Sequence, residues 1–161
     1  MIKKSSTLFL KLVIVLIAVP ILIGLLWFPQ VEGRNADATN RILIYFTDPF
    51  LAYVYLSSTP FFYGLAQAFK LLNLIDANKA FSQSAVNTLK RMKYAAICLT
   101  TFISLAVPWI FAFAQDDDAP GVVLIGIVLL FASAVIATAA AIFQKLFQSA
   151  VDLKEENDLT V

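Results

Sequence analysis

Long apolar runs separated by short polar stretches dominate the amino-acid sequence. No residue from Leu12 to Phe28 is charged, and three later runs are nearly as apolar. A helix needs roughly 17–25 apolar residues to cross a hydrocarbon core of about 30 Å, and the first run reaches that length together with Thr7–Leu10 before it. The pattern predicts an all-α fold, a polytopic membrane protein built as one domain over residues 1–161. The expected transmembrane helices occupy about 8–28, 50–72, 94–114 and 122–143.

Two amphipathic stretches extend the expected spans at one end. Ser82 is a candidate N-cap, and Phe81 before it and Val86 after it have the spacing of a hydrophobic staple. From Val86 onward apolar residues recur at three- and four-residue steps, and no helix breaker precedes the third span. The same periodicity continues after the fourth span. We therefore expect helices 3 and 4 to extend into the cytoplasm, with helical extensions at about 73–93 and 144–157.

The distribution of positive charge predicts the orientation. With four spans, every lysine and arginine except Arg34 and Arg41 falls on one side. Loops rich in lysine and arginine remain in the cytoplasm, so both termini and the middle connection are expected inside. The acidic stretch Asp116–Asp118 then lies outside. A solvated loop is the preferred interpretation of this stretch, because calcium needs six to eight spaced oxygen ligands.

The amino-acid composition excludes several classes of function. The chain of 161 residues is 60% hydrophobic, only 14% charged and has a net charge of +1, which is typical of a membrane protein and gives no field for direct nucleic-acid binding. It has no histidine and a single cysteine, Cys98, which lies in an apolar run and is expected to be buried. No nucleophile–base pair and no metal-ligand cluster can be proposed. We expect no enzyme activity, no cofactor and no metal site.

Polar residues within the expected spans allow two interpretations. The run Ser57-Ser58-Thr59 precedes Pro60, where hydroxyls commonly bond carbonyls at a kink; a polar spot on a substrate path is the alternative. Small residues four apart at Ser133, Ala137 and Ala141 permit close helix approach, to a helix of the same chain or of a second copy. The other polar candidates for a transport path, which suit interhelical hydrogen bonds equally well, are Gln67, Thr100, Thr101, Ser104 and Thr138.

Charged residues on the cytoplasmic extensions are the candidate contacts for a partner or for lipid. One group is basic and begins the third helix, and the other is acidic and ends the chain. Two interpretations are open: the groups compensate each other within a cytoplasmic bundle, or the basic face meets anionic lipid headgroups. The candidate residues are Lys90, Arg91, Lys93, Glu155, Glu156 and Asp158.

Three segments carry a resemblance to a known family. They are Leu71–Asp76 followed by Phe81–Ala95, the opening Lys4–Lys11, and the ending Lys154–Val161. Together they resemble a family of small bacterial four-helix membrane proteins catalogued as a domain of unknown function. Ala85 stands where a second serine-valine pair is expected to begin, and Met92 where isoleucine is usual.

The resemblance implies a multi-pass protein of the bacterial plasma membrane. It also implies a partner, because genes of this family are often paired with one for a small helix-turn-helix regulator of the Cro/C1 type. We therefore expect a regulatory or interaction subunit whose cytoplasmic helices bind such a regulator. A small transporter or a component of an oligomeric pore is the alternative, and a homo-oligomer is compatible with both.

Overall fold

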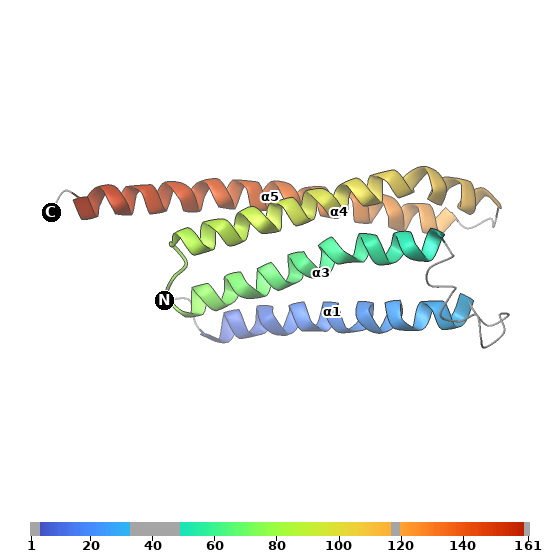
Figure 1. Cartoon of the computed structure of the whole chain (residues 1–161), viewed down its shortest axis with the longest axis horizontal. Helices are drawn as coiled ribbons and strands as arrows, with labels where there is room; N and C mark the ends of the chain where they lie inside the picture. Colours follow the sequence, from blue (N-terminus) through green and yellow to red (C-terminus); the bar gives the residue numbers. More distant parts are fainter. Residues whose placement is uncertain (1–3, 33–48, 117–119, 160–161) are drawn as a thin grey trace.

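The computed structural model describes residues 4–32, 49–116 and 120–159, and four antiparallel α-helices account for most of these residues. They are α1 (Lys4–Glu32), α3 (Pro49–Asp76), α4 (Gln83–Asp116) and α5 (Pro120–Leu159). The expected all-α fold is confirmed. Both described ends of the chain and the turn between α3 and α4 lie at the same end of the molecule (Figure 1).

The helices are arranged in the order in which they occur along the chain. The most extensive packing is between α4 and α5, followed by α3 with α4, and the least is between α1 and α3. α1 therefore lies at one edge of the layer, and α5 covers the far side of α4 (Figure 1). Most of the large side chains of α1 and α5 are exposed, as expected for surfaces that contact lipid.

Three of the described helices are long and apolar enough to cross a membrane. The qualifying segments are Ser5–Trp27, Gln83–Ala112 and Pro120–Asn157. α3 is also long, at 28 residues, but its tyrosines, its hydroxyl run and Gln67 lower its hydropathy. The sequence prediction of spanning helices is thus confirmed in length and composition for α1, α4 and α5.

The turn between α3 and α4 is built from local hydrogen bonds. Asn78 has a φ of 55°, in the left-handed region that few residues other than glycine and asparagine adopt. Its N–H donates to Ile75 O at 3.0 Å, and Lys79 N–H donates to Leu74 O at 2.8 Å. These are the two bonds of a Schellman motif, which ends α3 at this point.

α4 begins where the sequence predicts. Ser82 lies immediately before the first helical residue, and its Oγ accepts from Ala85 N–H at 3.4 Å while donating to Lys79 O at 2.7 Å. The N-cap prediction is confirmed. The Phe81 ring lies against the Phe147 ring of α5, with centroids 5.3 Å apart, so this residue joins α5 to the turn. The extension expected over 73–93 is therefore two helix ends joined by a turn.

The hydroxyls before Pro60 bond to their own helix. Ser57 donates to Val54 O at 3.0 Å, Ser58 to Tyr55 O at 2.7 Å, and Thr59 to Tyr55 O at 3.3 Å. Proline at position 60 has no N–H to donate to the preceding turn, and hydroxyls commonly supply bonds at such a site. The three hydroxyls therefore serve the backbone of their own helix, as the first interpretation of the run expects, although they bond the carbonyls of Val54 and Tyr55 and not that of Leu56, which Pro60 leaves without its helical donor.

Candidate interaction surfaces

The longest helix, α5, projects beyond the other helices. Its 40 residues correspond to about 60 Å at a rise of about 1.5 Å per residue, roughly twice the thickness of a hydrocarbon core. Figure 1 shows its C-terminal end extending past the start of α4. α5 is therefore longer than a hydrocarbon core is thick, and its C-terminal end projects beyond α4 (Figure 1).

One face of α5 packs against α4 and the turn before it. Its buried or half-buried positions recur at alternating four- and three-residue steps, the spacing of a helix–helix seam. Thr100 Oγ1 lies 3.0 Å from Ser133 Oγ, and a Cβ on Gly126 would come within 3.2 Å of Ile110. This seam, here called the inner stripe, comprises Gly126, Leu130, Ser133, Ala137, Ala140, Gln144, Phe147 and Val151.

The inner stripe answers a question that the sequence left open. Ser133 is 4% exposed and meets α4, so the small residues allow close approach to a helix of the same chain. Thr100 Oγ1 is also 2.8 Å from Ala96 O, and Ser133 Oγ is 2.9 Å from Leu130 O. These three contacts share two hydroxyl protons, so at most two of them are hydrogen bonds at one time.

The predicted contact residues fall in two separate places. Lys90 and Arg91 are exposed on α4, about two turns beyond its start, and Lys93 is half-buried with its Nζ 4.9 Å from the centre of the Tyr94 ring. Glu155 and Glu156 are exposed on the projecting end of α5. Asp158 is helical, but its side chain lies outside the part of the chain that is described.

No ion pair joins Lys90, Arg91 or Lys93 to any residue that the structure describes. The reason is geometric. Phe81, just before α4, touches Phe147 of α5. Because α4 and α5 are antiparallel, Glu155 and Glu156 lie on one side of this contact and Lys90 and Arg91 lie on the opposite side. The two groups are on the order of 20 Å apart along the helices. The predicted charge compensation between them is not formed by the described residues.

Sequence reasoning missed a charged contact between α1 and α3. Lys11 Nζ forms an ion pair with Asp76 Oδ2, and the two side chains are 23% and 28% exposed. Lys11 Nζ also lies 5.6 Å from the centre of the Phe69 ring. In the sequence, Lys11 contributes only to the positive charge that predicts the membrane orientation. Its pairing with a residue 65 positions away has no local signal.

A second polar contact holds the other end of α1. Tyr55 donates its hydroxyl proton to Leu25 O at 2.6 Å. In a regular helix this carbonyl accepts from the N–H of residue 29, which is proline. Tyr55 therefore satisfies a carbonyl that α1 itself cannot bond. A similar bond runs from the Tyr53 hydroxyl to Phe102 O, where the two rings meet edge to face at 5.8 Å.

The remaining polar residues of the spans serve the helices or have no recorded partner. Thr101 donates to Ile97 O at 3.0 Å and Thr138 to Ala134 O at 2.9 Å, both within one helix. Gln67 is 8% exposed, and its Oε1 has no hydrogen-bond partner among the described residues. Cys98 is exposed rather than buried as expected, because it lies on the outer surface of α4.

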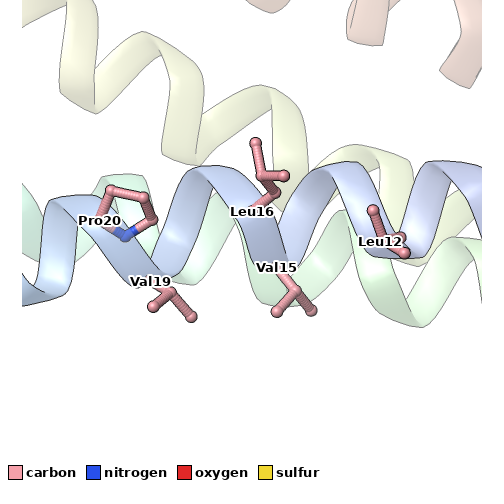
Figure 2. Close-up of a pocket in the computed structure, with 5 residues that line it drawn as sticks. All are labelled: Leu12, Val15, Leu16, Val19 and Pro20. Atoms are coloured by element: carbon pink, nitrogen blue, oxygen red, sulfur yellow. The ribbon is translucent and has the colours of Figure 1, made fainter.

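α1 carries a shallow apolar hollow on its surface (Figure 2). Its lining contains no polar side chain, and every lining residue belongs to α1 itself. The hollow ends at Pro20. Proline has no N–H, so the carbonyl of Leu16 lacks its usual helical donor. It is lined by Leu12, Val15, Leu16, Val19 and Pro20. Such a surface suits a lipid chain.

Apolar helices of spanning length, lipid-compatible outer surfaces and polar groups turned toward helix contacts define a helical membrane protein. The chain belongs to the family described as "Protein of unknown function (DUF2975)", whose model matches residues 31–161. It is 45% identical over 159 residues to the uncharacterized membrane protein YoaS of Bacillus subtilis (strain 168), covering 98% of this chain and 99% of that protein. No solved structure matches the chain.

Proposed function

We propose that the chain is a four-span protein of the bacterial plasma membrane with both ends in the cytoplasm. α3 is counted as the fourth span because it lies between α1 and α4 and is as long as α1 within one residue. Lys79 lies in the turn between α3 and α4, and Lys11, Lys90 and Lys93 lie within about the first three turns of α1 and α4. That turn and the starts of both helices are at the same end of the molecule (Figure 1). A basic cytoplasmic side follows from the positive-inside rule.

In this orientation the projecting end of α5 is an interaction element in the cytoplasm. The observation that carries the proposal is the length of α5, which leaves exposed acidic side chains such as Glu155 beyond the start of α4. A small helix-turn-helix regulator, the partner implied by the family resemblance, has the basic surface that this acidic end would attract. The protein would then hold such a regulator at the membrane.

The basic residues of α4 have a different role in this proposal. Lys90 and Arg91 are exposed near the membrane boundary, and Lys93 lies over the ring of Tyr94, a residue type common at interfaces. Anionic lipid headgroups attract lysine and arginine near the surface by about 1 kcal/mol each. These residues would fix the height of α4 in the bilayer, leaving partner binding to α5.

A pull-down from native cells tests the interaction role. The tagged full-length protein in mild detergent is compared with a variant lacking residues 154–161 and with the substitution pair Lys90→Glu and Arg91→Glu. We expect a small helix-turn-helix protein to be recovered with the full-length chain, lost with the truncation and retained with the substituted pair. Recovery of the chain alone, or of transporter subunits, would reject the regulator and favour self-assembly or transport.

A further inference from the structure

The projecting end of α5 carries two apolar stripes, and one of them is not used within the chain. Phe147 and Val151 belong to the inner stripe, and Val151 is 6% exposed. Phe143, Leu146 and Leu153 lie on another face and are 51%, 58% and 62% exposed. A second apolar face of this size is therefore open on the end of α5.

The open stripe has the spacing of a coiled-coil seam. Phe143, Leu146, Ala150 and Leu153 follow each other at steps of three, four and three residues, the a and d positions of a heptad. Every other residue from 144 to 157, apart from the inner-stripe residues Phe147 and Val151, is polar or charged. The a and d positions are also apolar in the preceding part of α5, within the expected membrane span. We call the whole set the outer stripe: Leu129, Ala132, Ile136, Ala139, Phe143, Leu146, Ala150 and Leu153.

Lipid cannot cover the end of this stripe. α5 begins at Pro120, and roughly 20 residues cross the hydrocarbon core, so Phe143 lies near the far boundary. Leu153 then lies about 15 Å further along the helix, in water. An exposed leucine at that distance, in register with a membrane-embedded stripe, points to a protein partner that also rises from the bilayer.

We propose that the outer stripe packs against the same stripe of a second copy of this chain, as a parallel pair of α5 helices. Two copies in one membrane have the same orientation, so a two-fold axis along the membrane normal places both stripes at the same height. A second copy therefore presents its stripe at the same height and in the same direction without any further constraint, whereas membrane insertion does not align a soluble protein in this way.

The charges beside the outer stripe fit this arrangement. Lys154 occupies one edge of the stripe, the e position, and Glu156 the other edge, the g position. A two-fold axis brings the basic edge of one α5 against the acidic edge of the other. The inner stripe remains on α4 in each copy, so the pairing needs no rearrangement of the monomer.

Site-specific disulfide formation tests the pairing. In a Cys98→Ser background, Leu153→Cys places a thiol on the seam, whereas Glu155→Cys places one on a different face two residues away. Both are oxidised in native membranes and separated without reductant. We expect a covalent dimer with Leu153→Cys and at least tenfold less with Glu155→Cys. Equal yields from the two positions, or no dimer from position 153, would overturn the proposal.

A second variant separates pairing from folding. Leu146→Glu combined with Leu153→Glu puts charges on the open stripe without touching the inner stripe, and Lys145→Glu combined with Gln148→Glu is the matched control. We expect the first pair to convert the protein from dimer to monomer in lipid nanodiscs, with unchanged helix content, and the control to remain dimeric. A wild-type chain that is monomeric in nanodiscs would contradict the inference.

This inference rests on the membrane orientation and not on the regulator. A dimer that forms without any helix-turn-helix protein would support the outer-stripe pairing even if the pull-down recovered no regulator. A regulator bound by a strictly monomeric chain would support the proposed function and reject the pairing.

Discussion

At the scale of single residues, backbone carbonyls freed by proline shape the contacts of α1. The carbonyl of Leu25 cannot bond within the helix because residue 29 is proline, and the Tyr55 hydroxyl donates to it across the α1–α3 interface. An unsatisfied carbonyl is costly in hydrocarbon, where no water replaces the missing donor. A tyrosine on α3 thus contributes to the placement of α1.

Replacing Tyr55 with phenylalanine should remove this bond while keeping the aromatic ring. We expect Tyr55→Phe to lower the free energy of unfolding by about 1 kcal/mol, the usual net value of a hydrogen bond, measured by denaturation in mixed micelles. Tyr63→Phe is the matched control, because Tyr63 is 46% exposed and its hydroxyl bonds to none of the described residues.

A double-mutant cycle shows whether the freed carbonyl is the cause. Pro29→Ala restores an N–H at position 29, so Leu25 O regains a helical donor and Tyr55→Phe should then cost much less. The same cost in both backgrounds would show that the loss arises elsewhere on the ring.

Residue-level features differ in how far the sequence predicts them. The N-cap at Ser82 depends on a local spacing and was predicted correctly. Asn78 was not singled out, because its left-handed φ becomes visible only with the turn that it closes. The Lys11–Asp76 ion pair joins residues 65 positions apart, so it depends on α1 and α3 lying side by side.

At the scale of helices, the closest approach is between α4 and α5. Gly126 lies on the inner stripe, where a Cβ would meet Ile110 Cδ1 at 3.2 Å, tighter than ordinary van der Waals contact. Gly24 in α1 has no heavy atom within 4 Å of the same position. The two glycines therefore share a helical backbone but differ in their neighbours.

Alanine substitutions at these glycines should have different effects. Gly24→Ala is expected to stabilise by up to about 1 kcal/mol, because alanine is the better helix former and space is free. Gly126→Ala gains the same propensity but pushes against Ile110, so its net effect should be smaller, and Gly126→Leu should destabilise by about 1–3 kcal/mol through overpacking. Thermal unfolding in one detergent measures all three. Equal gains from both alanines would contradict the close contact.

Hydropathy predicts where the helices lie along the chain, but it does not predict which helices pack against each other. The apolar runs gave α1, α4 and α5 directly. α3 is the exception in hydropathy, because the tyrosines and hydroxyls that lower its apolar character serve as donors to neighbouring helices and to its own backbone.

At the scale of the whole molecule, the number of spans decides the side of every later segment. If α3 crosses the membrane, Lys79 and Glu155 lie on the same side as Ser5. If α3 does not cross, Lys79 and Glu155 both lie on the side opposite Ser5. The two topologies therefore differ at two exposed positions.

Labelling of single cysteines distinguishes these topologies. In a Cys98→Ser background, cysteine is placed in turn at Ser5, Lys79 and Glu155 and treated with a membrane-impermeant maleimide on intact cells. We expect all three to be protected until the cells are opened, with Ala38→Cys labelled from outside as the control. Labelling of positions 79 and 155 in intact cells would show that the protein has three spans and that α3 does not cross the membrane.

The sequence by itself determined the class of protein, the places of the helices and the cap that starts α4. These features depend on local periodicity and on the cost of leaving apolar surface in water, which a linear pattern records. Tertiary structure alone decided that the inner stripe meets α4, that Lys11 pairs with Asp76 and that Glu155 lies far from Lys90. Those outcomes depend on which helices are neighbours and on their register, and in a chain that is apolar on nearly all helix faces hydropathy cannot specify either.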